Sequence, residues 1–116
     1  MSPRDWLDRI EDILTCIRNI QSFTAGMNFD EFSADIKTVR AVAFEFTTLG
    51  EASRAVPEGI QKKFSQIPWD KMQDMRNVII HGYYRLDENI LWETIREDLP
   101  PLRTALESIL VQGESS

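Results

Sequence analysis

The sequence has few of the residues that most often carry chemistry or cross-links, with one cysteine, Cys16, and one histidine, His81. A single cysteine excludes a disulfide within the chain, which leaves pairing between chains as a minor alternative. The helical spacing of Cys16 with Ile13 and Ile20 predicts a small core residue rather than a nucleophile. No apolar run approaches the roughly 20 residues of a membrane span, and no secretory leader is recognisable. We therefore expect a reduced, cytoplasmic protein without membrane contact.

Several enzyme motifs are also missing from the sequence. It has no Gly-rich phosphate loop, no zinc-type spacing of cysteine and histidine, and no serine-hydrolase elbow. Glu93 and Glu97 have a spacing that could suit a metal ion, but Arg96 lies between them and no histidine is nearby. A solvated face, or a docking surface for a basic partner, is the better interpretation. We expect no metal site.

The charge is negative overall but unevenly distributed. A net charge of −6 argues against a general nucleic-acid binder, which is usually basic. Residues 54–85, however, hold six basic side chains and three acidic ones, so this segment carries +3 and the remainder carries −9. This distribution predicts a locally cationic patch that could attract a polyanion.

Apolar residues recur at spacings of three and four over most of the chain, which is typical of amphipathic helices, and no strand pattern or repeat is evident. Asn28 and Glu31 have the spacing of a capping box, and Asp87 precedes an apolar run as an N-cap would. In the second helix, Ile36 belongs to the stripe that we expect to be buried. The predicted helices span residues 3–23, 28–54, 68–82, 87–98 and 100–112, with a short helical turn at 58–63.

The division of the last element rests on Pro100 and Pro101. Proline inside a helix removes a backbone donor and clashes with the preceding turn, so the pair should kink or split the element. The length and the 42% of hydrophobic residues suit one domain over residues 1–112, followed by a frayed tail at 113–116. The predicted fold class is an all-α bundle.

The stretch RNVIIHGYYR joins three chemically active side chains, those of Arg76, His81 and Tyr83. An imidazole can donate or accept a proton near neutral pH, and a guanidinium can hold a phosphate in a fork of hydrogen bonds. Together they indicate metal-free chemistry on a phosphodiester.

The spacing of Arg76 and His81 sets a geometric problem. On an ideal helix they are separated by about 140° around the axis and about 7.5 Å along it, so a regular helix does not place them on one face. Either the helix unwinds at His81, where Gly82 permits it, or two protomers contribute their side chains to one cleft. We expect a combination of both.

Arg76, four intervening residues, His81, one residue and Tyr83 resemble the signature of the HEPN superfamily in its HepT-like toxin branch. Three further segments look like successive landmarks of that family, and the resemblance covers about the last two thirds of the chain. It implies a four- or five-helix up-and-down bundle that dimerises with the active site at the interface. The segments are LGEASRAVPEGI (residues 49–60), IPWDKMQDMRNVIIHGYYRLD (67–87) and ILWETIREDLPPL (90–102).

The resemblance also implies a function. Such proteins are metal-independent RNA-cleaving toxins of toxin–antitoxin systems, controlled by a minimal nucleotidyltransferase (MntA-like) antitoxin. Arg76 and His81 become the catalytic pair, and Asn77 becomes an auxiliary polar group. Tyr83 becomes the residue to which the antitoxin transfers AMP, with Tyr84 as the competing acceptor. The chain itself then needs no cofactor, because ATP serves the antitoxin as AMP donor.

Glu51 and Ser53 are expected to face the motif from the second helix, where Glu51 would orient Arg76; an ordinary solvated glutamate is an equal alternative. Each motif residue also has a structural interpretation. His81 could cap carbonyl groups, Tyr83 could pack its ring, and Asn77 could be a plain surface residue. Arg76 could form a structural ion pair with Asp74 or with a neighbouring helix.

A second functional class competes with the nuclease: a non-catalytic HEPN module that binds a nucleotide or docks onto a nucleotidyltransferase. The negative charge and the single histidine favour this rival slightly. The complete set of Arg76, Asn77, His81 and Tyr83 favours the ribonuclease.

Overall fold

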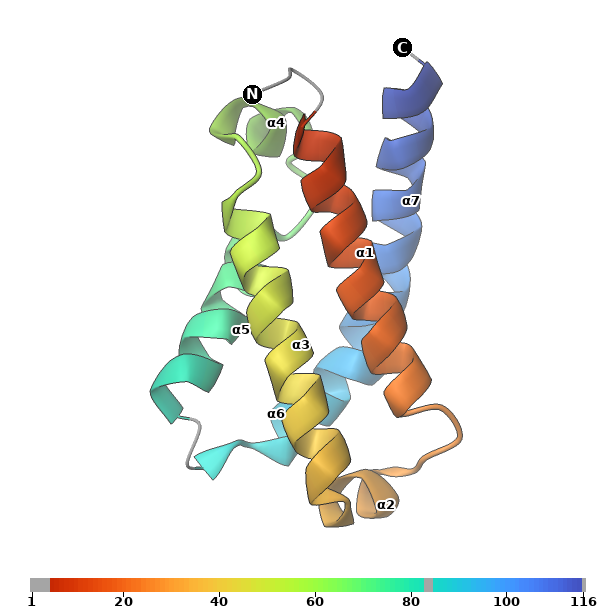
Figure 1. The fold of residues 1–116 in the computed structure, drawn as a ribbon, viewed down its shortest axis with the longest axis vertical. Coiled ribbons are helices and arrows are strands. Elements are labelled where there is room, and N and C mark those ends of the chain that lie inside the picture. Colours follow the sequence, from red (N-terminus) through yellow and green to blue (C-terminus); the bar gives the residue numbers. More distant parts are fainter. Residues whose placement is uncertain (1–4, 83–84, 116) are drawn as a thin grey trace.

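The computed structural model describes residues 5–82 and 85–115, and over these residues it contains helices and no strand, which confirms the all-α class. The long helices run alternately down and up in Figure 1, so that the start of α1 and the end of α7 lie at the same end of the molecule. Two short helices, α2 and α4, lie at the turns. The segments are α1 (Asp5–Phe23), α2 (Phe29–Ala34), α3 (Ile36–Arg54), α4 (Glu58–Lys63), α5 (Trp69–Gly82) and the run α6 (Glu88–Glu93), η2 (Thr94–Asp98) and α7 (Leu99–Ser115).

The hydrophobic core is organised around α3, which packs against both α1 and α5. Each fully buried large aliphatic or aromatic side chain contributes about 1.5–3 kcal/mol relative to an exposed one, so this layer is the main source of stability. Cys16 is buried in the same layer, as predicted. Burial, followed by the nearby carboxylate of Glu45, raises the pKa of its thiol to about 12, so the sulfur stays protonated. The largest fully buried side chains include Ile13, Ile17, Phe32, Val42, Phe46, Leu106 and Ile109.

The helix predicted over residues 28–54 is instead two helices, α2 and α3. The capping box at its start is confirmed, because the Glu31 N–H donates to Asn28 Oδ1 at 2.8 Å and the Asn28 N–H donates to Glu31 Oε1 at 3.0 Å. The chain then leaves the helix at Asp35, which is extended (φ −98°, ψ 90°) and accepts from the Thr38 N–H at 3.2 Å as the N-cap of α3. This break resets the helical phase, so Ile36 is 63% exposed and its predicted burial is wrong.

Asp35 interrupts the helix because its short carboxylate binds nearby backbone donors better outside a helix than within one. Hydrogen bonds from the side chain and then the backbone N–H of Thr38 lower the pKa of the Asp35 carboxyl. The cap therefore persists at neutral pH, where the carboxylate is ionised.

The last element stays continuous, in contrast to the predicted division at the two prolines. Asp87 caps its start as expected, accepting from the N–H groups of Asn89 and Ile90 at 3.0 and 3.3 Å. A π-helical segment, η2, then joins α6 to α7 just before Pro100 and Pro101. The wider π turn relieves the clash between a proline ring and the carbonyl group of the preceding turn. The helix continues to Ser115, so residues 113–115 are helical rather than frayed.

The predicted turn at residues 58–63 and the predicted helix at residues 68–82 are confirmed as α4 and α5. Trp69 fastens these two helices together. Its buried indole N–H donates to the carbonyl oxygens of Gln61 and Phe64, both at 3.1 Å. Trp92 packs its ring against Phe32, with ring centroids 5.2 Å apart. Both tryptophans therefore anchor the packing.

α3 and α5 approach each other closely at Gly50. A Cβ atom on this buried residue would collide with the Cβ of Arg76 and would lie 3.0 Å from the carbonyl oxygen of Met72. Glycine inside a helix costs about 1 kcal/mol relative to alanine, so a helix retains it where two backbones must come close. Gly50 therefore sets the position of Arg76 relative to α3.

We predict that Gly50→Ala lowers stability by about 1–3 kcal/mol, because the added methyl group forces α3 and α5 apart by more than the gain in helix propensity offsets. Thermal unfolding followed by circular dichroism measures the effect. Gly59→Ala is the matched control: a Cβ at this position in α4 meets nothing within 4 Å, so this variant should be equal to the parent or slightly more stable. Equal melting temperatures for the two variants would contradict the close approach.

Candidate active site

Arg76 lies on the side of α5 that faces α3, with 24% of its side chain exposed. Its guanidinium is held at two points. Nη2 forms an ion pair with Glu51 Oε1 of α3 at 2.5 Å, and Nη1 donates to Asn77 Oδ1 at 2.9 Å. Glu51 therefore contacts Arg76 as anticipated, and the ion pair of Arg76 joins neighbouring helices rather than involving Asp74.

The donors of this guanidinium are only partly used. An arginine side chain has five N–H groups. Two of them bind Glu51 and Asn77, and the Nε–H is buried without a hydrogen-bond partner among the described residues. A buried unpaired donor costs about 1–3 kcal/mol, which is typical of groups kept for a purpose other than stability. The two remaining Nη–H groups form a pair of donors suited to a phosphate.

His81 is exposed in the last turn of α5, and the helix remains regular through Gly82. The predicted unwinding at His81 is therefore wrong: glycine permits such a change without requiring it. On the regular helix Asn77 is about 100° from Arg76 and His81 about 140° from it, so Asn77 lies between the two. The three residues form a polar arc on α5, and Arg76 and His81 still do not share a face within one chain.

Tyr83 and Tyr84 lie outside the described residues, so the assignment of Tyr83 as the modified residue stays a prediction. Ser53, in contrast, is placed clearly. It is fully buried, and its hydroxyl donates to the carbonyl oxygen of Trp69 at 3.5 Å. Ser53 therefore joins α3 to the start of α5, two turns before Arg76. The expectation that it faces the motif is wrong.

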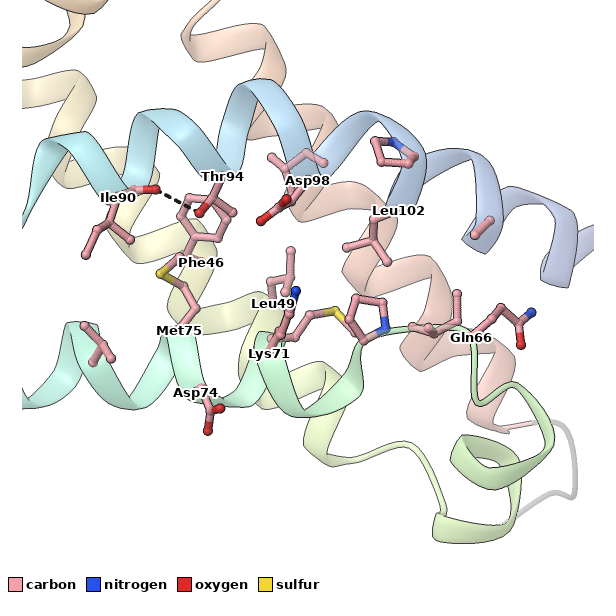
Figure 2. A pocket seen from close by; sticks show the side chains of 17 residues that line it. Phe46, Leu49, Gln66, Lys71, Asp74, Met75, Ile90, Thr94, Asp98 and Leu102 are labelled. Atoms are coloured by element: carbon pink, nitrogen blue, oxygen red, sulfur yellow. Dashed lines mark hydrogen bonds between the residues drawn. The ribbon is translucent and has the colours of Figure 1, made fainter.

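Two features beside this site leave little or no signal in the sequence. The first is Gly50, which is marked only as a glycine within a helical pattern, a feature that can signal close packing. The second feature is an apolar groove of about 530 Å³ between α5 and the η2–α7 run. In Figure 2, Met75 points from α5 toward Phe46 at the back of this groove, whereas Asp74 points away from it. Among its lining residues, Val78 and Ile90 are well exposed.

Among residues 5–82 and 85–115, no three side chains of histidine, cysteine, aspartate or glutamate gather closely enough to hold a metal ion. No helix in this part of the chain combines the length and the apolar character needed to cross a membrane.

Comparison with known proteins identifies the family. The family described as "Ribonuclease HepT-like" matches residues 13–109. A protein of Thermococcus cleftensis named "Probable ribonuclease HepT" is 37% identical over 106 residues, which cover 91% of this chain and 96% of that protein. Two proteins of Methanocaldococcus jannaschii, each named "Putative RNase", are 32% and 34% identical, covering 94% and 98% of this chain and 100% and 96% of their own lengths. No solved structure matches significantly.

The family match begins within α1 and ends within α7, so it includes the whole bundle and the helix that carries Arg76, Asn77 and His81. On this evidence the chain is a member of the HepT-like ribonuclease family of the HEPN superfamily.

Proposed function

We propose that this chain is a metal-independent endoribonuclease and the toxin of a toxin–antitoxin system. One observation carries the proposal: Glu51 and Asn77 hold the Arg76 guanidinium at the surface with two N–H groups left, on the same helix as the exposed His81. Relatives named as ribonucleases support the same activity.

RNA carries its own nucleophile, the 2′-hydroxyl group, so the protein needs to supply proton transfer, charge stabilisation and positioning. His81 takes the proton from the 2′-oxygen as that oxygen attacks phosphorus. The two remaining Nη–H groups of Arg76 bind the non-bridging oxygens, where negative charge builds up. The bond to the 5′-oxygen then breaks, the leaving oxygen takes a proton, and the products are a cyclic phosphate and a 5′-hydroxyl end.

The site needs a second copy of the chain for two reasons. Each chain has one histidine, so a second proton donor comes from His81 of the partner subunit. In addition, Arg76 and His81 do not share a face of the regular helix α5. Val78, one turn before His81, and Ile90 border the apolar groove beside this helix. A partner seated there would cover both residues and bring two copies of the motif together.

Family membership and the position of Tyr83 two residues after His81 support a proposal for how the activity is controlled. A minimal nucleotidyltransferase antitoxin transfers AMP from ATP to the Tyr83 oxygen and releases pyrophosphate. The phosphate of the adduct then pairs with Arg76 and occupies the place of the substrate phosphate.

We predict that the purified protein cleaves RNA in excess chelator and leaves cyclic phosphate ends. His81→Ala should lower the rate about 10²–10⁴-fold by removing proton transfer, and Arg76→Ala about 10²–10³-fold by removing charge stabilisation. Gel analysis of labelled RNA measures both rates. Arg18→Ala, which removes an exposed arginine of α1, should retain full activity. An absolute need for added metal would contradict the proposal, as would full activity of folded His81→Ala.

The dimer is tested by Val78→Asp, since a charge on this 59% exposed residue should disrupt the contact without affecting folding. We expect a monomer in light scattering, with cleavage reduced at least tenfold. Val111→Asp introduces the same charge at a 66% exposed valine of α7 and should leave a dimer. A Val78→Asp variant that remains dimeric and active would show that the groove is not the interface.

For the antitoxin, we predict that Tyr83→Phe abolishes AMP addition in intact-mass analysis because the acceptor oxygen is gone. Expression of this variant should arrest growth even beside an enzymatically active antitoxin. Tyr84→Phe is the matched control and should remain modified and neutralised. Loss of the adduct in Tyr84→Phe instead would move the modification to the neighbouring tyrosine.

A further inference from the structure

The exposed face of α3 combines an unburied aromatic ring with a free cation. Phe44 is 69% exposed, although phenylalanine in a soluble domain is usually buried. Arg40, one turn earlier, is exposed and has no ion-pair partner within the part of the chain that the structure describes. Neither residue serves the packing of the bundle.

These two residues share a face with Glu51. Phe44 and Glu51 are seven positions apart, which places them within about 20° of each other on a helix, and Arg40 lies about 20° from Glu51 on its other side. Because Glu51 reaches across to Arg76, this face of α3 borders α5 beside the candidate active site.

The two helices also place Phe44 at the height of His81. α3 and α5 run in opposite directions (Figure 1), and Gly50 marks the level of Arg76. From that level Phe44 lies about 9 Å along α3, and His81 lies about 7.5 Å along α5 in the same direction. The ring is therefore level with the imidazole, and Arg40 lies about 6 Å farther along α3.

The exposed face of α3 carries little negative charge, which is unusual for an acidic protein. Between Lys37 and Arg54, the exposed face of α3 has a single acidic side chain, Glu51, which Arg76 neutralises. The other carboxylate of α3, Glu45, turns toward α1, where it accepts from Asn19 at 3.3 Å. A polyanion can therefore approach along α3 without meeting unpaired negative charge on this helix.

We propose that the α3 track, consisting of Arg40 and Phe44, binds the single-stranded RNA next to the scissile phosphate. Phe44 stacks on an unpaired base, and Arg40 contacts a phosphate farther along the strand. Exposed aromatic rings between cations are the usual means of holding single strands, because every base has a face on which to stack. The inference rests on the proposed ribonuclease activity and adds a binding surface for its substrate.

Binding is tested with a fluorescein-labelled 2′-O-methyl oligouridine, which cannot be cut because its 2′-oxygen is blocked. Anisotropy titrations at several salt concentrations separate stacking from charge. Phe44→Ala should raise Kd about 5- to 150-fold with an unchanged salt slope, whereas Phe44→Trp should retain the affinity. Arg40→Ala should reduce the slope of log K against log salt by about 0.7, the value for one phosphate contact to a single strand.

Two matched variants exclude general effects. Phe23→Ala removes an aromatic ring that is 41% exposed at the end of α1, and Arg18→Ala removes an exposed cation of α1. Both should bind the probe like the parent. Unchanged affinity in Phe44→Ala overturns the track, and so does a Phe44→Ala variant that becomes monomeric in light scattering, because Phe44 would then belong to a protein interface.

Cleavage of unmodified RNA, measured in parallel, separates this inference from the proposed function. Binding that depends on Phe44 without any cleavage would reject the nuclease and keep the track. Cleavage with an unchanged KM in Phe44→Ala would keep the nuclease and reject the track.

Discussion

The contact between Gly50 and the stem of Arg76 is the constraint on which the site depends. Because Gly50 has no side chain, α3 and α5 come close enough for the Arg76 stem to lie against the α3 backbone. The guanidinium then emerges next to Glu51, one residue later on α3, and next to Asn77, one residue later on α5. Helix packing, rather than a specialised loop, thus fixes the direction of the cation. Rigid helices hold a functional group more accurately than loops do.

Polar groups around the motif divide into those that build the bundle and those that remain available. The hydrogen bonds of Ser53 and of the Trp69 indole join α3, α4 and α5. Arg76 and His81 keep donors and ring nitrogens at the surface. This division explains how one short helix can both complete the core through Met72 and Ile79 and present a polar face to solvent.

The sequence predicted the long helices well, because their apolar stripes and caps are local signals. It failed at Asp35, where a carboxylate that caps the following helix competes with an apolar stripe that continues past it. It failed again at the two prolines, because a π turn leaves no mark in a pattern with a period of 3.6 residues. Both errors arise where backbone hydrogen bonding, rather than side-chain burial, decides the course of the chain.

The candidate site was predictable in its members and less so in its arrangement. The contact of Glu51 with Arg76 followed from their expected places on adjacent helices, and the structure contains it. The bond between Arg76 and Asn77 was not anticipated, since neighbours along a helix normally diverge. Whether a helix unwinds at Gly82 depends on its surroundings, and sequence alone could not decide it. The exposure of Phe44 was not predicted, because an aromatic residue in a helical pattern is usually part of the core.

The burial of Cys16 has a practical consequence for spectroscopy. Its thiol is enclosed and stays protonated, so it should react slowly with maleimide or spin-label reagents while the protein is folded. A cysteine introduced at an exposed position would then be labelled selectively without removing the native one. Probes attached along α3 or α5 would test directly in solution whether a second copy of the chain or a nucleic acid approaches these helices.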